Sequence, residues 1–454
     1  MKKIFSFLLL ALLLLLLTGC GGFEQALNLD GDTDGYTFIT SRFDEPLDLA
    51  LYFEKYTTAR AEEFDLLVIG CDGLAARISG GDLTGCTLVY SKQFAWELRS
   101  ESHPPSANIK NIAKLAVVST SDDPRAARFI SGDDVQGFTA GQLLLRNSLR
   151  ALKEEGTSQQ GGKSVTVYTT RWRLPLAELF GDGQDAAFCA TGFNGKTVYF
   201  RTTDNCFLEF GGNQIDLLLA DGQRLENLAG VMADPPGFMI TEASADALRF
   251  LHQDERVMIV ELDGLGYSAL RLAGSKFAPF LFSLNPKPAL ACYPPVSSVG
   301  LAAMLTGETP DINGVQSRDD REPAAEDLFS KAEKLGKTCA YIEGAHSLIK
   351  TSLRPVLSGD DGETFQNALD AAANRPDLMF VHFHGIDEVS HEHGPYSKQV
   401  LLKIRELDGY VQSLAESFDG RLIITSDHGQ HDEDGVGDHG EFLAQDMIVP
   451  YSRR

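Results

Sequence analysis

Aspartate and histidine residues recur at short spacing in the C-terminal part of this chain of 454 residues. Carboxylate oxygens and imidazole nitrogens are the usual ligands of Zn²⁺ in catalytic sites. The residues that could act in this way are Asp263, Asp387, His391, Asp427, His428 and His439. Any one of them has an ordinary explanation, since an aspartate after a strand often caps a helix. Their concentration in one region favours a metal site instead.

Two adjacent hydroxyls, Ser297 and Ser298, separate a proline pair from an apolar run that has the character of a helix. A serine at the start of a helix commonly bonds a free backbone N–H of the first turn. A serine in the same place can also be exposed where helix amides favour a bound anion. Direct contact with Zn²⁺ makes its alkoxide accessible at neutral pH, so the stretch also fits a nucleophile.

Short apolar runs precede the polar residues and predict the strands that position them. Arg256–Gly264 is largely apolar and ends in Asp-Gly, which suits a parallel strand buried on both faces. Similar runs occupy 338–342, 378–383 and 422–426, with helical stretches between them. The alternation predicts an α/β domain over 250–454 with a doubly wound, mostly parallel sheet. In such sheets sites gather at the carboxyl ends of strands, where the polar residues stand.

The order of these motifs resembles the alkaline phosphatase superfamily, in particular its nucleotide pyrophosphatase/phosphodiesterase branch. The resemblance covers roughly residues 254–450. The motifs that carry it are Asp263-Gly, a hydroxyl before Leu305-Thr-Gly, Asp387-xxx-His391, Asp427-His428-Gly and His439-Gly.

The resemblance implies two zinc ions and an attacking serine. The ion that activates the nucleophile would be held by Asp263, Asp427 and His428. The ion beside the leaving oxygen would be held by Asp387, His391 and His439. Counting back from Gly307 to the family's nucleophile position gives Ser297, which would also contact the first ion. Ser298 would need a shift of one residue.

Departures from the family pattern leave the substrate class open. Diesterase relatives carry Phe-Pro-Asn after the nucleophile, where this chain has Ser298-Val-Gly300. After the helix they carry a histidine and then an asparagine, where this chain has Asn313 and Arg318. An arginine grips a phosphoryl dianion strongly, so monoesters and diesters both remain candidate substrates. The sulfatase motif is absent, and His384 and His393 receive no role from the resemblance.

The first residues predict an exported lipoprotein. A basic pair, Lys2-Lys3, precedes an apolar stretch too short to span a bilayer comfortably. Leu17-Thr-Gly-Cys20 resembles the lipobox of bacterial lipoproteins, in which the cysteine is lipidated and becomes the N-terminus. An uncleaved anchor helix or an ordinary signal peptide is the alternative. We therefore expect a signal peptide over 1–20, a linker over 21–35, and an extracytoplasmic protein tethered to the membrane through Cys20.

Composition narrows the range of partners. The formal net charge of −24 argues against a nucleic-acid backbone or anionic lipid as the main partner. The expected partners are a phosphoester substrate and the membrane that receives the lipid.

Two stretches before the α/β domain resemble each other. Ile39–Leu47 aligns with Tyr168–Leu176, and each has a β-like run, an arginine, an aromatic residue and then Pro-Leu. We interpret them as two copies of one β-rich module, over 36–150 and 163–240. The Gly/Ser/Gln stretch at 155–162 is the predicted linker between them.

The modules carry no convincing catalytic cluster. Matching cysteines predict the bridges Cys71–Cys86 and Cys189–Cys206, with free buried thiols as the alternative. Gly192–Lys196 and Phe207–Leu218 faintly resemble the molybdopterin-binding domain of the sulfite oxidase fold, without a cysteine placed to ligate molybdenum. A binding or spacer role, with an unknown ligand, is expected.

The sequence as a whole predicts metal-dependent hydrolysis of phosphoesters, either diesters and nucleotides or monoesters, through two zinc ions and a serine. One alternative is a transferase that passes a phosphoryl, phosphoglycerol or phosphoethanolamine group to surface glycans or lipids. Another is a surface-binding lipoprotein whose enzyme-like domain is inactive.

Overall fold

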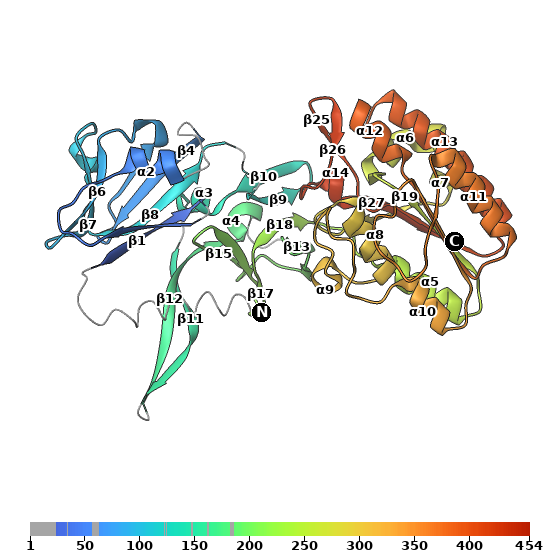
Figure 1. Cartoon of the computed structure of the whole chain (residues 1–454), viewed down its shortest axis with the longest axis horizontal. Coiled ribbons are helices and arrows are strands. Elements are labelled where there is room, and N and C mark those ends of the chain that lie inside the picture. Colours follow the sequence, from blue (N-terminus) through green and yellow to red (C-terminus); the bar gives the residue numbers. More distant parts are fainter. Residues whose placement is uncertain are drawn as a thin grey trace. The chain divides into compact units, whose positions relative to one another are not determined.

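The computed structural model describes residues 24–454 apart from 34, 57–62, 122, 124, 147–148, 161–162 and 182–185. The predicted signal peptide and Cys20 lie outside the described residues. Within the described part of the chain, no helix combines the length and apolar character needed to cross a membrane. The chain divides into two units (Figure 1). The first is Met1–Ala126, Gly137–Pro175 and Phe207–Asp216, and the second is Ala127–Gln136, Leu176–Cys206 and Leu217–Arg454.

The first unit is mainly β-structure. Its elements are β1 (Gln25–Gly31), β2 (Tyr36–Thr40), β3 (Leu47–Asp48), α2 (Leu49–Tyr56), β4 (Phe64–Gly70), β5 (Ala75–Ser79), η2 (Gly80–Asp82), β6 (Cys86–Ser91), β7 (Ala95–Ser100), η3 (Pro105–Ala107), β8 (Ile112–Ser119), α3 (Ala140–Leu144), β11 (Leu149–Gln160), β12 (Lys163–Pro175) and β15 (Phe207–Gly211). One sheet has the order β2-β1-β8-β4-β5 and another the order β3-β6-β7. Phe38, Leu66 and Leu88, from both sheets, share one buried cluster, so the core lies between the sheets.

The predicted linker at 155–162 is instead part of a long hairpin. β11 and β12 pair in antiparallel register from Leu149↔Arg173 to Gln160↔Lys163. Only Trp172–Pro175 of β12 also pair with β15. The β-branched residues that open β12 favour an extended strand, and its backbone hydrogen bonds hold the polar stretch in β11 whatever its side chains. The linker prediction is therefore wrong over the described residues.

The second unit begins with a sheet whose arrangement of strands matches that of the sheet β2-β1-β8-β4-β5 in the first unit. Two strands, β10 (Asp134–Phe138) and β16 (Gln214–Leu218), cross the division between the units. The sheet's order is β10-β9-β18-β13-β14. β1 runs parallel to β8, as β9 does to β18, and β4 is antiparallel to β8, as β13 is to β18. The elements of this part are β9 (Ala127–Ser131), α4 (Ala177–Phe180), β13 (Phe188–Gly192), β14 (Thr197–Phe200), β17 (Arg224–Leu225) and β18 (Leu228–Ala233).

The predicted module boundaries do not follow these sheets. β9 lies inside the predicted first module, 36–150, yet it pairs with β18. Strand β1 begins at Gln25, before that module and within the predicted linker of 21–35. Strand pairing depends on contacts distant in sequence, so a short local match does not locate the ends of a sheet. That the two sheets are copies of one module stays a prediction.

The predicted disulfides are not formed. All six cysteines of the described chain are free. Cys71 is exposed in the turn after β4, whereas Cys86 is buried and its Sγ lies 3.4 Å from Ser100 Oγ. Cys189 is buried in β13, and Cys206 Sγ donates to the carbonyl of Thr202 at 3.3 Å. Each buried thiol already has its own packing or hydrogen-bond environment.

The C-terminal domain is built on a seven-stranded sheet of order β20-β27-β24-β19-β23-β21-β22. β19 runs parallel to β23 and β24, and β21 runs parallel to β23 and β22. β27 is antiparallel to β24 and β20. The domain is α/β with a mostly parallel sheet, as predicted. Its elements are α5 (Glu242–His252), β19 (Val257–Leu262), α6 (Tyr267–Phe277), α7 (Pro279–Ser283), β20 (Lys287–Leu290), α8 (Ser297–Thr306), α9 (Pro310–Asn313), α10 (Leu328–Lys334), β21 (Cys339–Glu343), β22 (Val356–Leu357), α11 (Asp361–Ala373), β23 (Leu378–Phe383), α12 (Gly385–His393), α13 (Lys398–Ser417), β24 (Arg421–Thr425), β25 (His431–Glu433), β26 (Val436–Asp438), α14 (Ala444–Met447) and β27 (Ile448–Arg453).

Helices cover both faces of this sheet (Figure 1). Val257 and Ile259 of β19 pack in the cluster that includes α5, α8 and α10. Met258 and Val260 pack in the cluster that includes α6, α11 and α13. Alternate residues of a strand point to opposite faces, so the continuous apolar run places β19 at the centre of the domain.

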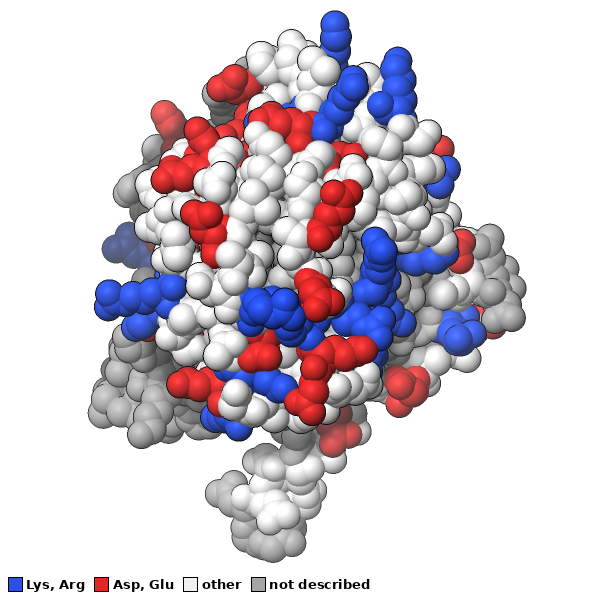
Figure 2. All heavy atoms as spheres, turned by 90° about the vertical axis from the view of Figure 1, so that its right-hand side faces the viewer, with Lys and Arg blue, Asp and Glu red and all other residues white. Residues whose placement is uncertain are grey.

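Charged side chains of both signs are interspersed on the face that Figure 2 shows. The chain as a whole carries 64 acidic and 40 basic residues, but Figure 2 shows no single-sign patch over this face. Interspersed charges favour solubility over a single-sign binding surface on this face.

We predict that cysteine reactivity follows burial. In the native protein Cys71 should react first with Ellman's reagent, and the half-buried Cys339 more slowly. The buried Cys292 should react only on unfolding, because burial raises the pKa of its thiol to about 12. Cys71→Ser should remove the fast phase. A thiol count in denatured, unreduced protein that falls short of all six would contradict the free cysteines.

Candidate metal centre

The predicted ligands converge at the carboxyl edge of the central strands. Asp263 follows β19, and Asp427 and His428 follow β24. Asp387 and His391 lie on α12, which begins after β23. Parallel neighbouring strands end at the same edge, so three separate stretches of sequence deliver their side chains to one place.

Two more residues reach this edge from other elements. Ser297 is the first residue of α8, and His439 directly follows β26. His439 lies over His428 with ring centroids 3.8 Å apart and planes at 12°. The structure thus brings all seven predicted metal-site residues together.

Four of these residues form a first group around the imidazole of His428. Its Nε2 lies 3.4 Å from Asp263 Oδ1, 3.3 Å from Asp427 Oδ2 and 3.2 Å from Ser297 Oγ. Ligands at about 2.0 Å from a tetrahedral zinc ion lie about 3.3 Å from one another. The three distances from His428 Nε2 are therefore those expected between ligands of one zinc ion.

Two buried oxygens of this group have no hydrogen-bond partner. They are Asp263 Oδ1 and Asp427 Oδ2, the same atoms that face His428. The other oxygen of Asp427 accepts from the backbone N–H of His428 at 2.9 Å and of Gly264 at 3.2 Å. A buried carboxylate oxygen without a partner costs free energy unless a cation satisfies it. The donor set therefore fits a divalent metal.

A second group centres on Asp387. Its Oδ2 lies 3.4 Å from His391 Nε2, and its Oδ1 lies 3.7 Å from His439 Nε2. Oδ1 also accepts a short hydrogen bond from Gln430 Nε2. One carboxylate thus faces two imidazole nitrogens, which is the donor set predicted for the second ion.

Backbone carbonyls orient the three histidines. Nδ1 lies 2.8 Å from the carbonyl of Gly437 in His391, 3.0 Å from that of Gly429 in His428, and 2.9 Å from that of Pro295 in His439. A neutral imidazole that donates from Nδ1 presents Nε2 as an acceptor. Metal-ligating histidines are commonly held in this way, so each Nε2 is prepared to bind a cation.

Electrostatics also favour a cation at this place. Burial and the neighbouring carboxylate of Asp263 raise the pKa of Asp427 to about 6. Burial and the neighbouring His428 lower the pKa of His439 to about 3, so its imidazole is neutral near pH 7. The hydrogen bond to Asp387 raises the pKa of His391 to about 9, and the carboxylates of Asp427 and Asp263 raise the pKa of His428 against the effect of burial. A metal ion that bound these two imidazoles would therefore displace their protons.

The two adjacent serines have different environments. Ser297 Oγ faces His428, whereas Ser298 is buried and its Oγ donates to the carbonyl of Ser317 at 2.9 Å. Gly300, the family departure, lies where α8 touches Asp427. A Cβ there would come within 2.7 Å of the carbonyl oxygen of Asp427. The close approach of helix and ligand loop accounts for the glycine.

Arg318 extends the site on the side of the second group. Its Nη2 lies 3.3 Å from both Nε2 and the carbonyl oxygen of His439. The residue is exposed, and no ion pair joins it to a carboxylate within the described part of the chain. Its position where the family carries an asparagine makes it a candidate ligand for an anionic substrate group.

Sequence reasoning missed three charged residues beside Asp263. They are Glu261 in β19, Glu343 in β21 and His382 in β23, all fully buried. The sequence did contain a signal for these residues, because an ionisable residue inside an apolar strand-like run is rare unless it has a partner. His384, left without a role, contacts Asp263 and Glu343, whereas His393 lies 3.7 Å from Glu392 at the end of α12.

Comparison with protein families finds a family model that matches the end of the chain. Residues 346–450 match the model of the Type I phosphodiesterase / nucleotide pyrophosphatase family. The matched segment contains the second group and also Asp427 and His428, while Asp263 and Ser297 precede it.

Individual relatives are similar over limited lengths. The human GPI ethanolamine phosphate transferase 3, catalytic subunit, is 35% identical over 166 residues, which are 32% of this chain and 15% of that protein. GPI ethanolamine phosphate transferase 1 of Neurospora crassa is 38% identical over 97 residues, which are 19% of this chain and 10% of that protein. The chain thus spans a small part of the length of these relatives.

Among solved structures, human ectonucleotide pyrophosphatase / phosphodiesterase 5 aligns with a TM-score of 0.37 at 14% identity. The alignment covers 44% of this chain and 88% of that one.

The family match over 346–450 supports a relation of the C-terminal domain to the phosphodiesterases and nucleotide pyrophosphatases of the alkaline phosphatase superfamily.

Proposed function

We propose that the C-terminal domain is a metal-dependent hydrolase of phosphoesters with Ser297 as its nucleophile. The observation that carries the proposal is the Ser297 hydroxyl, 3.2 Å from His428 Nε2 and beside the unpartnered oxygens of Asp263 and Asp427. The family match supports it, because phosphodiesterases cleave phosphoesters and nucleotide pyrophosphatases cleave the related phosphoanhydride bond.

Two zinc ions would fit the two groups of donors. Asp263, Asp427 and His428 would hold one. Asp387, His391 and His439 would hold the other, since the Asp387 carboxylate faces both imidazoles, and His428 also lies within ligand distance of Asp387 and His439. Bound there, the ions would favour the ionised serine and neutralise charge on the entering and leaving oxygens.

The proposed reaction has two steps, and in each of them one bond to phosphorus forms while another breaks. Ser297 Oγ attacks phosphorus while the bond from phosphorus to the leaving oxygen breaks, so the phosphoryl group becomes esterified to the serine. The Asp387 side of the site receives the leaving oxygen, which departs with a proton. Water then attacks phosphorus, the phosphorus–Ser297 bond breaks and the hydroxyl is restored.

Arg318 would bind a non-bridging oxygen of the phosphoryl group during both steps. Its guanidinium lies beside His439 and has no carboxylate in ion-pair contact among the described residues. A charge-assisted hydrogen bond of this kind is stronger for the dianion of a monoester than for the monoanion of a diester.

A transferase is the second candidate function. The observation that favours it is the similarity to GPI ethanolamine phosphate transferases, whose names state transfer of ethanolamine phosphate. The same serine ester would form, and the hydroxyl of a glycan or lipid would attack phosphorus in place of water.

The place of action is also a proposal. We propose that the chain is a lipoprotein held outside the cytoplasm by acyl groups on Cys20, on the strength of the basic pair, the apolar stretch and Leu17-Thr-Gly-Cys20. An extracytoplasmic enzyme would meet phosphoesters of the cell surface.

We predict that Ser297→Ala abolishes turnover. With the full-length protein loaded with zinc, hydrolysis of p-nitrophenyl phosphate or of bis-p-nitrophenyl phosphate should fall at least about a thousandfold, because the serine ester no longer forms. Zinc removal by a chelator should have a similar effect, reversed by adding zinc back. Ser298→Ala is the matched control, and its loss should be within about tenfold, since its hydroxyl bonds Ser317.

The same assay separates the candidate functions. Bound zinc with trapped phosphoserine but no hydrolysis, relieved by an added alcohol acceptor, would favour the transferase. Protein that binds no zinc and turns over neither substrate would reject the enzyme and favour a binding protein.

We predict that Arg318 sets the preference between substrates. Arg318→Ala should lower kcat/KM by about a hundredfold for the monoester and by less for the diester, since one charge-assisted contact is lost. Arg318→Lys should recover part of the monoester activity but not the full value, because lysine lacks the planar fork. Equal losses on both substrates would show that Arg318 does not set the preference, and no loss on either would show that the guanidinium does not bind the phosphoryl group.

We predict that Cys20 carries the lipid. Cells that express the full-length protein and are fed alkyne palmitate should label it, and Cys20→Ala should prevent both labelling and recovery in the membrane fraction. Labelling that persists in Cys20→Ala would contradict the lipobox.

A further inference from the structure

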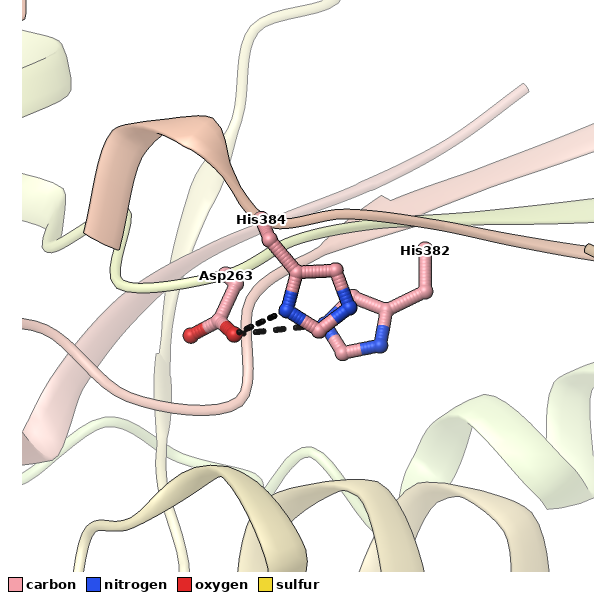
Figure 3. Close-up of side chains that lie close together, drawn as sticks. All are labelled: Asp263, His382 and His384. Carbon is pink, nitrogen blue, oxygen red and sulfur yellow. Dashed lines mark ion pairs between the residues drawn. The ribbon is translucent and has the colours of Figure 1, made fainter. Parts of the chain in front are cut away.

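A set of buried ionisable side chains surrounds the second oxygen of Asp263. We call it the buried histidine cluster: Asp263, His382, His384, Glu261 and Glu343. His382 lies on β23 and His384 directly after its end. Figure 3 shows both imidazole rings beside the carboxyl group of Asp263, with ion pairs to the same oxygen.

Both histidines direct one nitrogen at Asp263. His384 Nδ1 lies 3.1 Å and His382 Nε2 lies 3.5 Å from Asp263 Oδ2. The ring centroids are 3.9 Å apart. The two nitrogen–oxygen distances, 3.1 and 3.5 Å, lie on either side of the distance of about 3.3 Å between ligands of a tetrahedral zinc ion.

Glu343 takes the remaining nitrogen of each ring. Its Oε1 lies 2.7 Å from His384 Nε2 and 2.8 Å from His382 Nδ1. Two further donors hold the Glu343 carboxylate in place. The hydroxyl of Tyr341 donates to Oε2 at 2.6 Å, and the N–H of Gly344 donates to Oε1. A carboxylate behind the far nitrogen is the common support of a metal-ligating histidine.

The carboxylate of Glu261 and the Nε2 of His382 lack a hydrogen-bond partner. Glu261 is 0% exposed, and neither of its carboxylate oxygens is satisfied. His382 is also 0% exposed; its Nε2 makes no hydrogen bond and lies 3.6 Å from Glu261 Oε1. Separations of 3.5 and 3.6 Å are too long for hydrogen bonds. A buried carboxylate in this condition is costly unless a cation lies beside it.

We propose that the buried histidine cluster binds a third metal ion, separate from the two of the proposed catalytic centre. Asp263 Oδ2, His382 Nε2 and His384 Nδ1 are its ligands. Glu261, whose Oε1 lies 3.6 Å from His382 Nε2, is the candidate for the fourth ligand. Two imidazoles with carboxylates, in a site where Asp263 and His382 are buried and His384 is partly exposed, favour Zn²⁺.

The third ion would support the first group without touching the substrate. Asp263 would bridge, since its Oδ2 belongs to the cluster and its Oδ1 faces His428. The ion would also join the ends of β19, β21 and β23, which supply the cluster residues. Its role is therefore to position Asp263 and stabilise this edge of the sheet.

Metal counting tests the proposal without relying on activity. The full-length protein is saturated with zinc chloride, freed of loose metal on a chelating resin, and analysed for zinc per chain. Wild type should hold about three ions, as the three donor groups predict. His384→Gln, which removes a ligand but keeps a polar side chain, should hold about two.

A matched variant separates this site from the proposed catalytic centre. Asp387→Asn removes a ligand of the second group and should also lower the count by about one ion, and the double variant with His384→Gln should lose both. An anomalous difference map of wild-type crystals at the zinc edge should show density between His382 and His384.

The outcomes differ for the two proposals. Zinc at the catalytic groups alone, with the same count in His384→Gln as in wild type, would overturn the third site and leave the proposed function standing. Zinc at the cluster alone would support the third site and reject the two-ion catalytic centre. Should His384→Gln fail to fold, the wild-type map decides between them.

Discussion

The C-terminal domain depends on how it compensates buried negative charge at one edge of its sheet. Asp263 and Asp427 are both buried there, and each presents an oxygen that no hydrogen bond satisfies. Glu261 adds a third unsatisfied carboxylate. Carboxylates this close repel one another in a medium of low dielectric constant, so the folded domain must either place positive charge among them or keep some of them protonated. The proposed metal ions would supply that charge.

The fold by itself orients the side chains that are the candidate metal ligands. Each of His391, His428 and His439 bonds a backbone carbonyl through Nδ1, so the tautomer and the direction of Nε2 are set by the main chain. Gly300 lets α8 approach Asp427 closely enough for Ser297 to reach His428. A site held by backbone in this manner loses little entropy when it binds its metal.

The N-terminal sheets show the opposite relation between sequence and structure. Local similarity suggested repeated modules, but the sheets begin at β1 and β9, outside the aligned stretches. The stretch 155–162 has the composition of a linker, yet its described residues form a ladder with β12. Cys71 and Cys86 match Cys189 and Cys206 in sequence order but are not bonded. In the sheets a partner distant in sequence decided the outcome, whereas in the hairpin the neighbouring strand did.

The sequence by itself determined the α/β character of residues 250–454 and the candidate ligands after β19, β23 and β24. Apolar runs of strand length and metal-ligating residue types are local properties, and parallel strands must end at one edge. Only the tertiary structure decided that Ser297 rather than Ser298 faces His428, and that His382 and His384 share one oxygen of Asp263 with Glu343 behind them. Those contacts join neighbouring strands and helices, and sequence spacing does not encode the direction of a side chain across such a junction.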